Sequence, residues 1–308
     1  MGINYFDCAR AYTHCEERLG EAVKGRRDQV IIATRDKAHD RKEMAEAVDT
    51  SLRTLGTDYV DIYQCHEIHQ LSDLDAVLAP GGAIEALRAA REAGKIRFIG
   101  MTSHNPDVVL AALDTGLFDA VFIMLNYVNR RMVDEVLPRC RHENIGVAII
   151  KPLGGCLLAA HADLALRWVL QQEGVHTTPV GMWRPFELEA NAKVGEDFQP
   201  LGEQELSVLD ERRAALLPGF CRLCYRHYEC PHGVETDDLV IFDLLCTRHG
   251  IQEAIERGWD KKLEAVARCA ECEDRERCAA SCPFGLNIPE TLERMHRTYM
   301  PVLEAHRA

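Results

Sequence analysis

The chain has 308 residues, 47% of them hydrophobic, which suffices for one barrel-sized core and a smaller appendage. Its formal net charge is −13 and its acidic residues are spread along the chain, so we expect no nucleic-acid partner. The chain opens without a basic region or an apolar signal segment, and its longest apolar runs, such as residues 120–125, are too short to span a bilayer. We therefore expect a soluble, cytoplasmic protein without a membrane partner.

Short apolar runs alternate with amphipathic stretches up to about residue 200. The expected strands are 3–7, 29–34, 59–65, 96–102, 120–125, 146–151 and 178–181. The expected helices are 17–23, 42–55, 83–93, 106–113, 132–142, 163–171 and 185–192. Buried strands that are each followed by a helix are typical of parallel βαβ units. Seven such units, with no glycine-rich dinucleotide fingerprint after the first strand, favour a TIM-type (β/α) barrel over a doubly wound sheet.

The pattern contains seven strands, whereas such a barrel has eight. We therefore expect a barrel that lacks its first strand and has an open or patched seam beside residues 3–7. A helix over 203–216 ends this region, and paired cysteines then dominate, with further helices expected at 239–249 and 251–266. The sequence predicts a barrel domain over 1–217 and a small, mostly helical, cysteine-rich domain over 218–308.

Polar residues follow several of the expected strands, at the end where barrels hold their reacting groups. Asp7 ends the first strand, Tyr12 comes five residues later, and His66 follows the third. A tyrosine hydroxyl can protonate a carbonyl oxygen while hydride reaches the carbon, and a histidine can donate a hydrogen bond to the same oxygen. A neighbouring cation would make the tyrosine a better proton donor. Each residue alone could equally be structural.

Here the sequence resembles a known family. The run GINYFDCARAYTHCEERLGEAV resembles the signature of the aldo-keto reductases, in which a strand ends in the catalytic Asp and the catalytic Tyr follows. The run SLRTLGTDYVDIYQCH resembles that family's helix and the strand that ends at its catalytic His. The segments IGMTSHN, IIKPLGG and VGMWRPFELEAN resemble those that hold its nicotinamide cofactor.

The resemblance implies roles for residues between 2 and 192. Tyr12 would be the proton donor, His66 the group that orients the carbonyl, and Asp7 the anion that holds a cation beside Tyr12. Ser103 and His104 would face the carboxamide of NAD(P)H. The other expected cofactor-binding residues, from the strand ends, the pyrophosphate turn and the adenosine end, are Asn126, Lys151, Gly154, Gly155, Gly181, Arg184, Glu187 and Asn191.

Three positions depart from the family pattern. Thr34-Arg35 stands where a catalytic lysine is expected, and arginine keeps the positive charge but is bulkier and hardly ever loses its proton. Phe122 lies near the position of a glutamine that would bind the carboxamide. Glu187 falls where a basic residue often grips the 2′-phosphate of NADPH, which tilts the expectation towards NADH.

Eight of the thirteen cysteines lie in residues 221–308, and seven of them form two sets that each end in Cys-Pro, with Cys246 between the sets. The first has Cys221, Cys224 and Cys230, with His227 in place of a further cysteine, and the second has Cys269, Cys272, Cys278 and Cys282. This spacing is the form of a ferredoxin-type [4Fe–4S] site, and the segment resembles the ferredoxin-like C-terminal domain found on one branch of the aldo-keto reductases.

We expect one [4Fe–4S] cluster on the second set, and a second centre on the first set with His227 or Cys246. In two-cluster ferredoxins the fourth cysteine of each set crosses to the other cluster, which would exchange one ligand between the sets. Structural zinc and free thiols are the alternatives. Hydride carries two electrons and such a cluster passes one, so a structural cluster, or one that serves a redox partner protein, fits better than an internal relay.

Two classes of function remain open. The first is an NAD(P)H-dependent oxidoreductase that reduces a small carbonyl substrate or oxidises an alcohol. The second is a non-catalytic nicotinamide-binding or regulatory protein on the same scaffold, which Arg35 and the missing strand would favour.

Overall fold

The computed structural model describes residues 1–182, 184–224, 230–234, 236, 239, 242, 243, 246, 250–256 and 263–307. These residues form two compact units. The first comprises residues 1–153 and 161–205, and the second comprises residues 154–160 and 206–308. Compared with the domain limits that the sequence predicts, residues 154–160 and 206–217 group with the second unit rather than the first.

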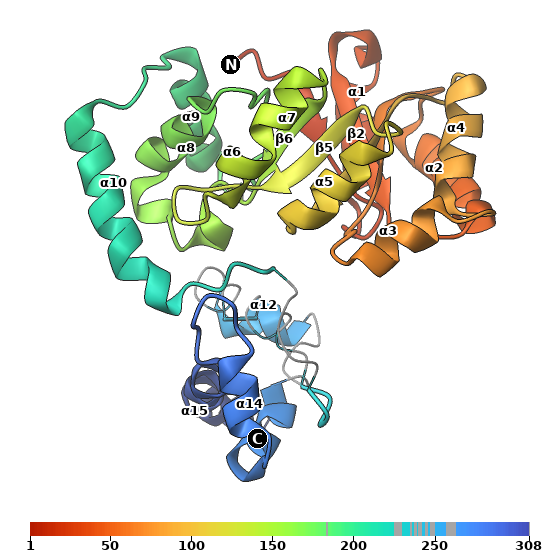
Figure 1. Ribbon diagram of the computed structural model, residues 1–308. Coiled ribbons are helices and arrows are strands. Elements are labelled where there is room, and N and C mark those ends of the chain that lie inside the picture. Colours follow the sequence, from red (N-terminus) through yellow and green to blue (C-terminus); the bar gives the residue numbers. More distant parts are fainter. Residues whose placement is uncertain are drawn as a thin grey trace. The chain divides into compact units, whose positions relative to one another are not determined.

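The first unit is built on a parallel sheet with helices around it (Figure 1). Its six strands pair in chain order. The strands are β1 (Tyr5–Asp7), β2 (Ile31–Asp36), β3 (Val60–Cys65), β4 (Ile96–Ser103), β5 (Ala120–Met124) and β6 (Gly146–Ile150). β5 is buried throughout, as expected of a strand covered on both faces. Because all six strands run the same way, their carboxyl ends meet at one edge of the sheet.

The sheet is a parallel half-barrel rather than the seven-stranded barrel that the sequence predicts. β1 lies at one edge, and beyond β6 the expected strand at 178–181 is replaced by a single parallel bridge between Ala148 and Thr177. Thr177 exchanges backbone hydrogen bonds with Val147 and Ile149, but Pro179 has no N–H with which to extend that ladder. The prediction of this last strand was wrong.

Helices follow the strands, as the alternating pattern predicts. Those of the first unit are α1 (Cys15–Val23), α2 (Arg41–Leu55), α3 (Leu71–Leu78), α4 (Ala83–Glu92), α5 (Pro106–Asp114), α6 (Arg131–Glu135), α7 (Leu137–His142), α8 (Ala162–Leu170) and α9 (Pro185–Glu196), with a 3-10 turn, η1 (Arg27–Gln29). The single helix expected over 132–142 is divided into α6 and α7, with Pro138 in the first turn of α7, where its missing N–H is tolerated.

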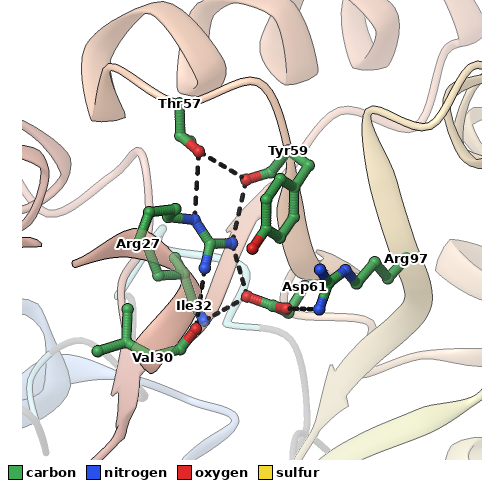
Figure 2. A network of polar contacts seen from close by, with 7 residues as sticks. All are labelled: Arg27, Val30, Ile32, Thr57, Tyr59, Asp61 and Arg97. Carbon is green, nitrogen blue, oxygen red and sulfur yellow. Dashed lines mark hydrogen bonds and ion pairs between the residues drawn. The ribbon is translucent and has the colours of Figure 1, made fainter. Parts of the chain in front are cut away.

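The amino ends of β2 and β3 are joined by a network around the buried carboxylate of Asp61 (Figure 2). Asp61 accepts hydrogen bonds from Arg27 at 2.6 Å, from Arg97 at 2.9 Å and from the backbone N–H of Ile32 at 2.9 Å. The two guanidinium groups also lie over the ring of Tyr59, at 4.0 Å and 4.2 Å from its centre. This end of a β/α fold serves stability, whereas the carboxyl end carries chemistry.

The second unit is mostly helical. Its described helices are α10 (Glu203–Leu216), whose first three residues belong to the first unit, α12 (Ile251–Glu256), α14 (Arg275–Ala280) and α15 (Ile288–Arg307). Its 3-10 turns are η2 (Gly154–Cys156), η3 (Ala159–His161, of which His161 belongs to the first unit), η4 (Leu217–Gly219) and η5 (Ala265–Glu271). A core of buried residues, which includes Phe242, Leu263 and Met295, packs against the side chains of Cys230, Cys246, Cys269, Cys278 and Cys282. His227 and most of the helix expected at 239–249 lie outside the described residues.

None of the helices in the described part of the chain is long and apolar enough to cross a membrane.

Candidate active site

The carboxyl edge of the sheet collects the polar residues that follow the strands. Asp7 ends β1, Arg35 is the penultimate residue of β2, His66 follows β3 and Ser103 ends β4. The register pairs Arg35 with Gln64, so these two side chains lie at the same level, and it pairs Asp7 with Ala33, two residues before Arg35 on β2. Tyr12 lies on the loop between β1 and α1, and its side chain is 48% exposed.

Arg35 links Asp7 to Tyr12. It donates one hydrogen bond from Nη1 to Oδ1 of Asp7 at 2.5 Å and another from Nη2 to Oδ2 at 2.8 Å. The same Nη2 donates to the hydroxyl of Tyr12 at 3.3 Å. The arrangement that the sequence predicts, an anion holding a cation beside the tyrosine, is therefore present with a guanidinium in the lysine's place.

His66 completes the group. Its ring meets the ring of Tyr12 edge-on, with 6.2 Å between the ring centres and 84° between the planes. Its Nε2 is 3.8 Å from a carboxylate oxygen of Glu67, and Glu67 pairs with Lys37. The side chain of Lys37 is 55% exposed and forms an ion pair with Glu67. The cation that donates a hydrogen bond to Tyr12 is Arg35.

Burial sets the charge states here. It lowers the pKa of His66 to about 2, with Arg35, Lys37 and His69 adding to the effect, so this imidazole is neutral at physiological pH. Burial alone would lower the pKa of Arg35, but the charge and hydrogen bonds of Asp7 more than offset it and raise that pKa. Burial raises the pKa of Asp7, and Arg35 opposes that rise.

Two supporting residues escaped the sequence interpretation. The buried Gln64 accepts a hydrogen bond from Nη1 of Arg35 at 3.3 Å, and the buried Glu16 accepts one from the hydroxyl of Thr34 at 2.7 Å. Arg10 donates to Glu16 as well, at 3.3 Å. Gln64 is a polar residue in the mostly apolar strand β3, which is a signal in the sequence, whereas Glu16 is followed by the polar Glu17 and Arg18 and carries no such signal.

The expected carboxamide-binding residues lie along the same edge but also hold their own loops. The Ser103 hydroxyl donates to the backbone of Asn105, and Oδ1 of Asn126 accepts from the backbone N–H groups of Val128 and Asn129. Nδ2 of Asn126 donates to the carbonyl of Lys151 at 3.2 Å. The ring of His104 stacks on that of His69, and its burial holds its pKa well below the usual value. Phe122 fills the interior of the half-barrel with Ala33 and Ala148.

The residues expected at the far end of the cofactor are divided between the units. Gly154 and Gly155 have positive φ angles of 55° and 66° and belong to the second unit, so the structure does not relate them to the carboxyl edge of the sheet. Arg184 and Gly181 are exposed at the start of α9, and Asn191 is half-buried on it. A carboxylate oxygen of Glu187 accepts a hydrogen bond from the backbone N–H of Arg184 and caps that helix.

In the second unit the structure groups the cysteines differently from the two sequence sets. Cys230 of the first set lines one cavity with Cys269, Cys272 and Cys278 of the second. Cys282 does not line this cavity, and the guanidinium of Arg222, between Cys221 and Cys224, lies 3.8 Å from the ring centre of Phe284, two residues after Cys282. Within the described residues, no three His, Cys, Asp or Glu side chains are arranged to hold one metal ion.

The family model described as "Aldo/keto reductase family" matches residues 1–163. This chain belongs to the aldo/keto reductase family. The expected relation is thereby confirmed, whereas the iron–sulfur branch of the family is not shown. Membership supports the expectation of an NAD(P)-dependent oxidoreductase.

Relatives within the family align over much of the chain. The chain is 28% identical to an L-galactose dehydrogenase of Arabidopsis thaliana over 263 residues, which cover 71% of this chain and 81% of the relative. It is 30% identical to an NADH-specific methylglyoxal reductase of Escherichia coli over 181 residues, which cover 51% of this chain and 54% of the relative. The chain thus spans only about half the length of the second relative.

Solved structures agree on the fold. The holo form of an aldo-keto reductase from Bacillus halodurans matches with a TM-score of 0.58 and 25% identity, over 68% of this chain and 82% of that one. An aldo/keto reductase from Klebsiella pneumoniae in complex with NADP and acetate matches with a TM-score of 0.56 and 24% identity, over 68% and 80% of the two chains.

Proposed function

We propose that this protein reduces the carbonyl group of a small substrate with hydride from NADH or NADPH, or oxidises the corresponding alcohol, with Tyr12 as the proton donor. The observation that carries this proposal is the 3.3 Å hydrogen bond from Arg35 to the Tyr12 hydroxyl, at the carboxyl edge of the sheet and beside His66.

The charges suit that role. When the tyrosine gives its proton to a carbonyl oxygen, negative charge develops on its own oxygen, and Nη2 of Arg35 lies within hydrogen-bonding distance to stabilise it. Asp7 and Gln64 orient the guanidinium, so little reorganisation accompanies the proton transfer. Neutral His66 offers a hydrogen-bond donor without competing for the proton. A bound nicotinamide would supply the hydride.

The residues at this edge fit a polar ligand. Among the described residues, Nε of Arg35, Nε2 of Gln64 and Nδ1 of His66 are buried without a hydrogen-bond partner. Buried polar atoms of this kind are costly unless something satisfies them, and a bound substrate or carboxamide could do so. Ser103, His104, Asn126 and Lys151 lie at the ends of the next strands and would hold the nicotinamide part.

We further propose that NADH is preferred over NADPH. Glu187 presents a carboxylate in the first turn of α9, where it would repel a 2′-phosphate and accept a hydrogen bond from a free 2′-hydroxyl. The exposed Arg184 beside it offers the only opposing charge among the expected contacts at this end.

Isotope transfer tests the reaction itself. The protein is incubated with a panel of aldehydes and with NADH that carries deuterium in the transferable position. The proposal predicts deuterium on the carbinol carbon of the alcohol product. Nicotinamide binding without any deuterated product, over the whole panel, would instead support a non-catalytic binding protein.

For the second unit, we propose one or two [4Fe–4S] clusters whose ligands cross between the cysteine sets. One cluster would be held by Cys269, Cys272, Cys278 and Cys230, which share a cavity. A soft, all-thiolate donor set of this kind fits iron–sulfur clusters or zinc. One hydrogen bond supports the pairing of the two segments, because Arg268 donates to the carbonyl of His232 at 2.8 Å.

A second centre would combine Cys282 with Cys221 and Cys224. The contact between Arg222 and Phe284 supports this combination, because it holds the two cysteine segments beside each other. The fourth ligand, for which His227 is the candidate, lies outside the described residues. Because hydride moves two electrons and a cluster moves one, we assign the clusters a structural role or the service of a redox partner.

Anaerobic purification followed by iron and sulfide analysis tests this proposal. A Cys230→Ser variant should lose the same fraction of iron as Cys269→Ser, and Cys140→Ser, in α7 of the first unit, should keep its full content. Stoichiometric zinc in a colourless protein would assign the centre to zinc. A folded second unit without either metal would rule out both.

A further inference from the structure

The loop that carries Tyr12 begins on strand β2. The backbone N–H of Cys8 donates a hydrogen bond to the carbonyl of Ala33 at 2.9 Å. Two residues later, the backbone N–H of Arg10 donates to the carbonyl of Arg35 at 3.1 Å. These two bonds continue the ladder between the first two strands beyond the end of β1. The loop therefore starts directly beside the residue whose guanidinium contacts the tyrosine.

The side chain of Arg10 ties the same loop to the residue that follows Arg35. Its Nε lies 3.4 Å from a carboxylate oxygen of Asp36. The backbone carbonyl of Asp36 accepts a hydrogen bond of 2.9 Å from the N–H of His66. Arg10 thus contacts the residue of β2 that also fixes the chain at His66, so one side chain relates the tyrosine loop to the histidine.

A second nitrogen of Arg10 reaches a buried carboxylate in the first turn of α1. Its Nη1 donates to Oε2 of Glu16 at 3.3 Å, and only 5% of the Glu16 side chain is exposed. Oε1 of Glu16 accepts a hydrogen bond from the hydroxyl of Thr34 at 2.7 Å. Because Thr34 precedes Arg35 on β2, the pair of Arg10 and Glu16 joins the loop to the residues on both sides of Arg35.

The position of Tyr12 depends on this anchoring, because its own side chain is 48% exposed. The loop between the anchors is compact, with backbone hydrogen bonds from Tyr12 to Ala9 at 3.0 Å and from Cys15 to Tyr12 at 2.9 Å. A compact loop moves as one piece when its anchors move. The 3.3 Å contact between the Tyr12 hydroxyl and Arg35 is therefore sensitive to the side chain of Arg10.

We propose that Arg10 is a positioning residue for Tyr12. It holds the loop at the distance from which the Tyr12 hydroxyl meets Arg35, and it acts through the loop rather than by contact with the substrate. An arginine suits this task, because its fork offers separate nitrogens to Glu16 and Asp36, whereas a lysine offers one point charge. The effect on turnover rests on the proposed function of Tyr12, and the effect on the loop does not.

The test variant is Arg10→Met/Glu16→Gln. The second substitution is included because Arg10→Met alone leaves the Glu16 carboxylate buried without its cation, which costs stability. Glutamine keeps an acceptor for the Thr34 hydroxyl. Since a misplacement of about 1 Å can cost about 100-fold in rate, we expect kcat to fall roughly 10- to 100-fold and the Kd for NADH to stay within about twofold. Arg18→Met, at an exposed position of α1, is the matched control.

Crystal structures of the full-length wild type and of both variants measure the position of Tyr12 without reference to activity. In Arg10→Met/Glu16→Gln the Tyr12 hydroxyl should lie beyond hydrogen-bonding distance of Arg35, while the ion pair between Arg35 and Asp7 is kept. In Arg18→Met both contacts should remain. A variant structure in which the Tyr12 hydroxyl still meets Arg35 would overturn the proposal.

A double-mutant cycle with Tyr12→Phe shows whether Arg10 acts on the rate through the tyrosine. Arg10→Met/Glu16→Gln should slow the wild type but leave the residual kcat of Tyr12→Phe unchanged. Equal fold-losses in the two backgrounds would show that Arg10 acts elsewhere and would overturn the positioning role. A displaced tyrosine in a protein whose wild type reduces no aldehyde would contradict the proposed function and leave the anchoring of the loop standing.

Discussion

Arg35 on β2 donates hydrogen bonds to both carboxylate oxygens of Asp7 on β1, at 2.5 Å and 2.8 Å. Only 4% of the Arg35 side chain and 11% of the Asp7 side chain are exposed. A lysine would present one ammonium point charge here, whereas the guanidinium fork satisfies both oxygens and still reaches Tyr12. The arginine in the lysine's place therefore keeps a cation on the tyrosine.

Removing that cation should destabilise the protein. In Arg35→Met the carboxylate of Asp7 stays buried without its partner, so we expect the free energy of unfolding to fall by about 3–5 kcal/mol. Urea unfolding followed by circular dichroism measures the change. The double variant Asp7→Asn/Arg35→Met should recover part of the loss, and an Arg35→Met protein as stable as the wild type would contradict the buried ion pair.

Stability should also fall in mild acid. Burial lowers the pKa of His66 to about 2 and that of His69 to about 4, whereas an unfolded histidine has a pKa near 6.5. Below about pH 6.5 the unfolded chain therefore binds protons that the folded chain does not, and each such histidine lowers the free energy of unfolding by about 1.4 kcal/mol per pH unit. Above that pH the effect vanishes.

The slope of stability between pH 5 and pH 6.5 checks this prediction. His66→Gln should reduce the average slope over this range by about 1 kcal/mol per pH unit, since a histidine of the unfolded chain is only half protonated at pH 6.5. His142→Gln, at an exposed position at the end of α7, is the matched control. A slope that His66→Gln leaves unchanged would mean that His66 is not held neutral in the folded protein.

The network at the other end of the strands should matter for stability alone. Asp61→Ala removes the acceptor of the Ile32 backbone N–H and one of the acceptors of Arg27 (Figure 2). We expect a loss of about 2–4 kcal/mol in the free energy of unfolding, with turnover unchanged. The control is Asp58→Ala, at an exposed position before β3. Loss of turnover in a folded Asp61→Ala protein would show that this end takes part in function.

Much of the first unit can be predicted from local signals. Helix α2 is capped at its start by Asp40, whose side chain accepts hydrogen bonds from two backbone N–H groups, and at its end by Gly56 in the left-handed conformation. Both residue types are typical of these positions and can be recognised in the sequence. The prediction of a strand at 178–181 was wrong because Pro179 has no N–H to extend the ladder beyond Thr177, a signal that the sequence itself carries. The short α3 was missed because eight residues hold too little periodicity to stand out.

In the candidate active site, too, some residues can be placed from the sequence and others cannot. Asp7, Tyr12 and His66 could be placed because parallel strands bring their carboxyl ends together. Gln64 could not be assigned to Arg35, because only the register between β2 and β3 puts the two side by side. The pairing of Cys230 with the second cysteine set likewise depends on how distant segments pack, and spacing along the chain does not encode that.

The role of Tyr12 as proton donor is tested most directly by the steady-state rate of NADH oxidation with an aldehyde that the wild type reduces. The rate is compared between Tyr12→Phe and the control Tyr59→Phe. Tyr59 lies at the opposite end of the strands, between Arg27 and Arg97. Tyr12→Phe should lower kcat by at least about 100-fold while NADH binding changes little, and Tyr59→Phe should keep the wild-type rate. A Tyr12→Phe protein with the wild-type kcat would contradict the role of Tyr12 as proton donor.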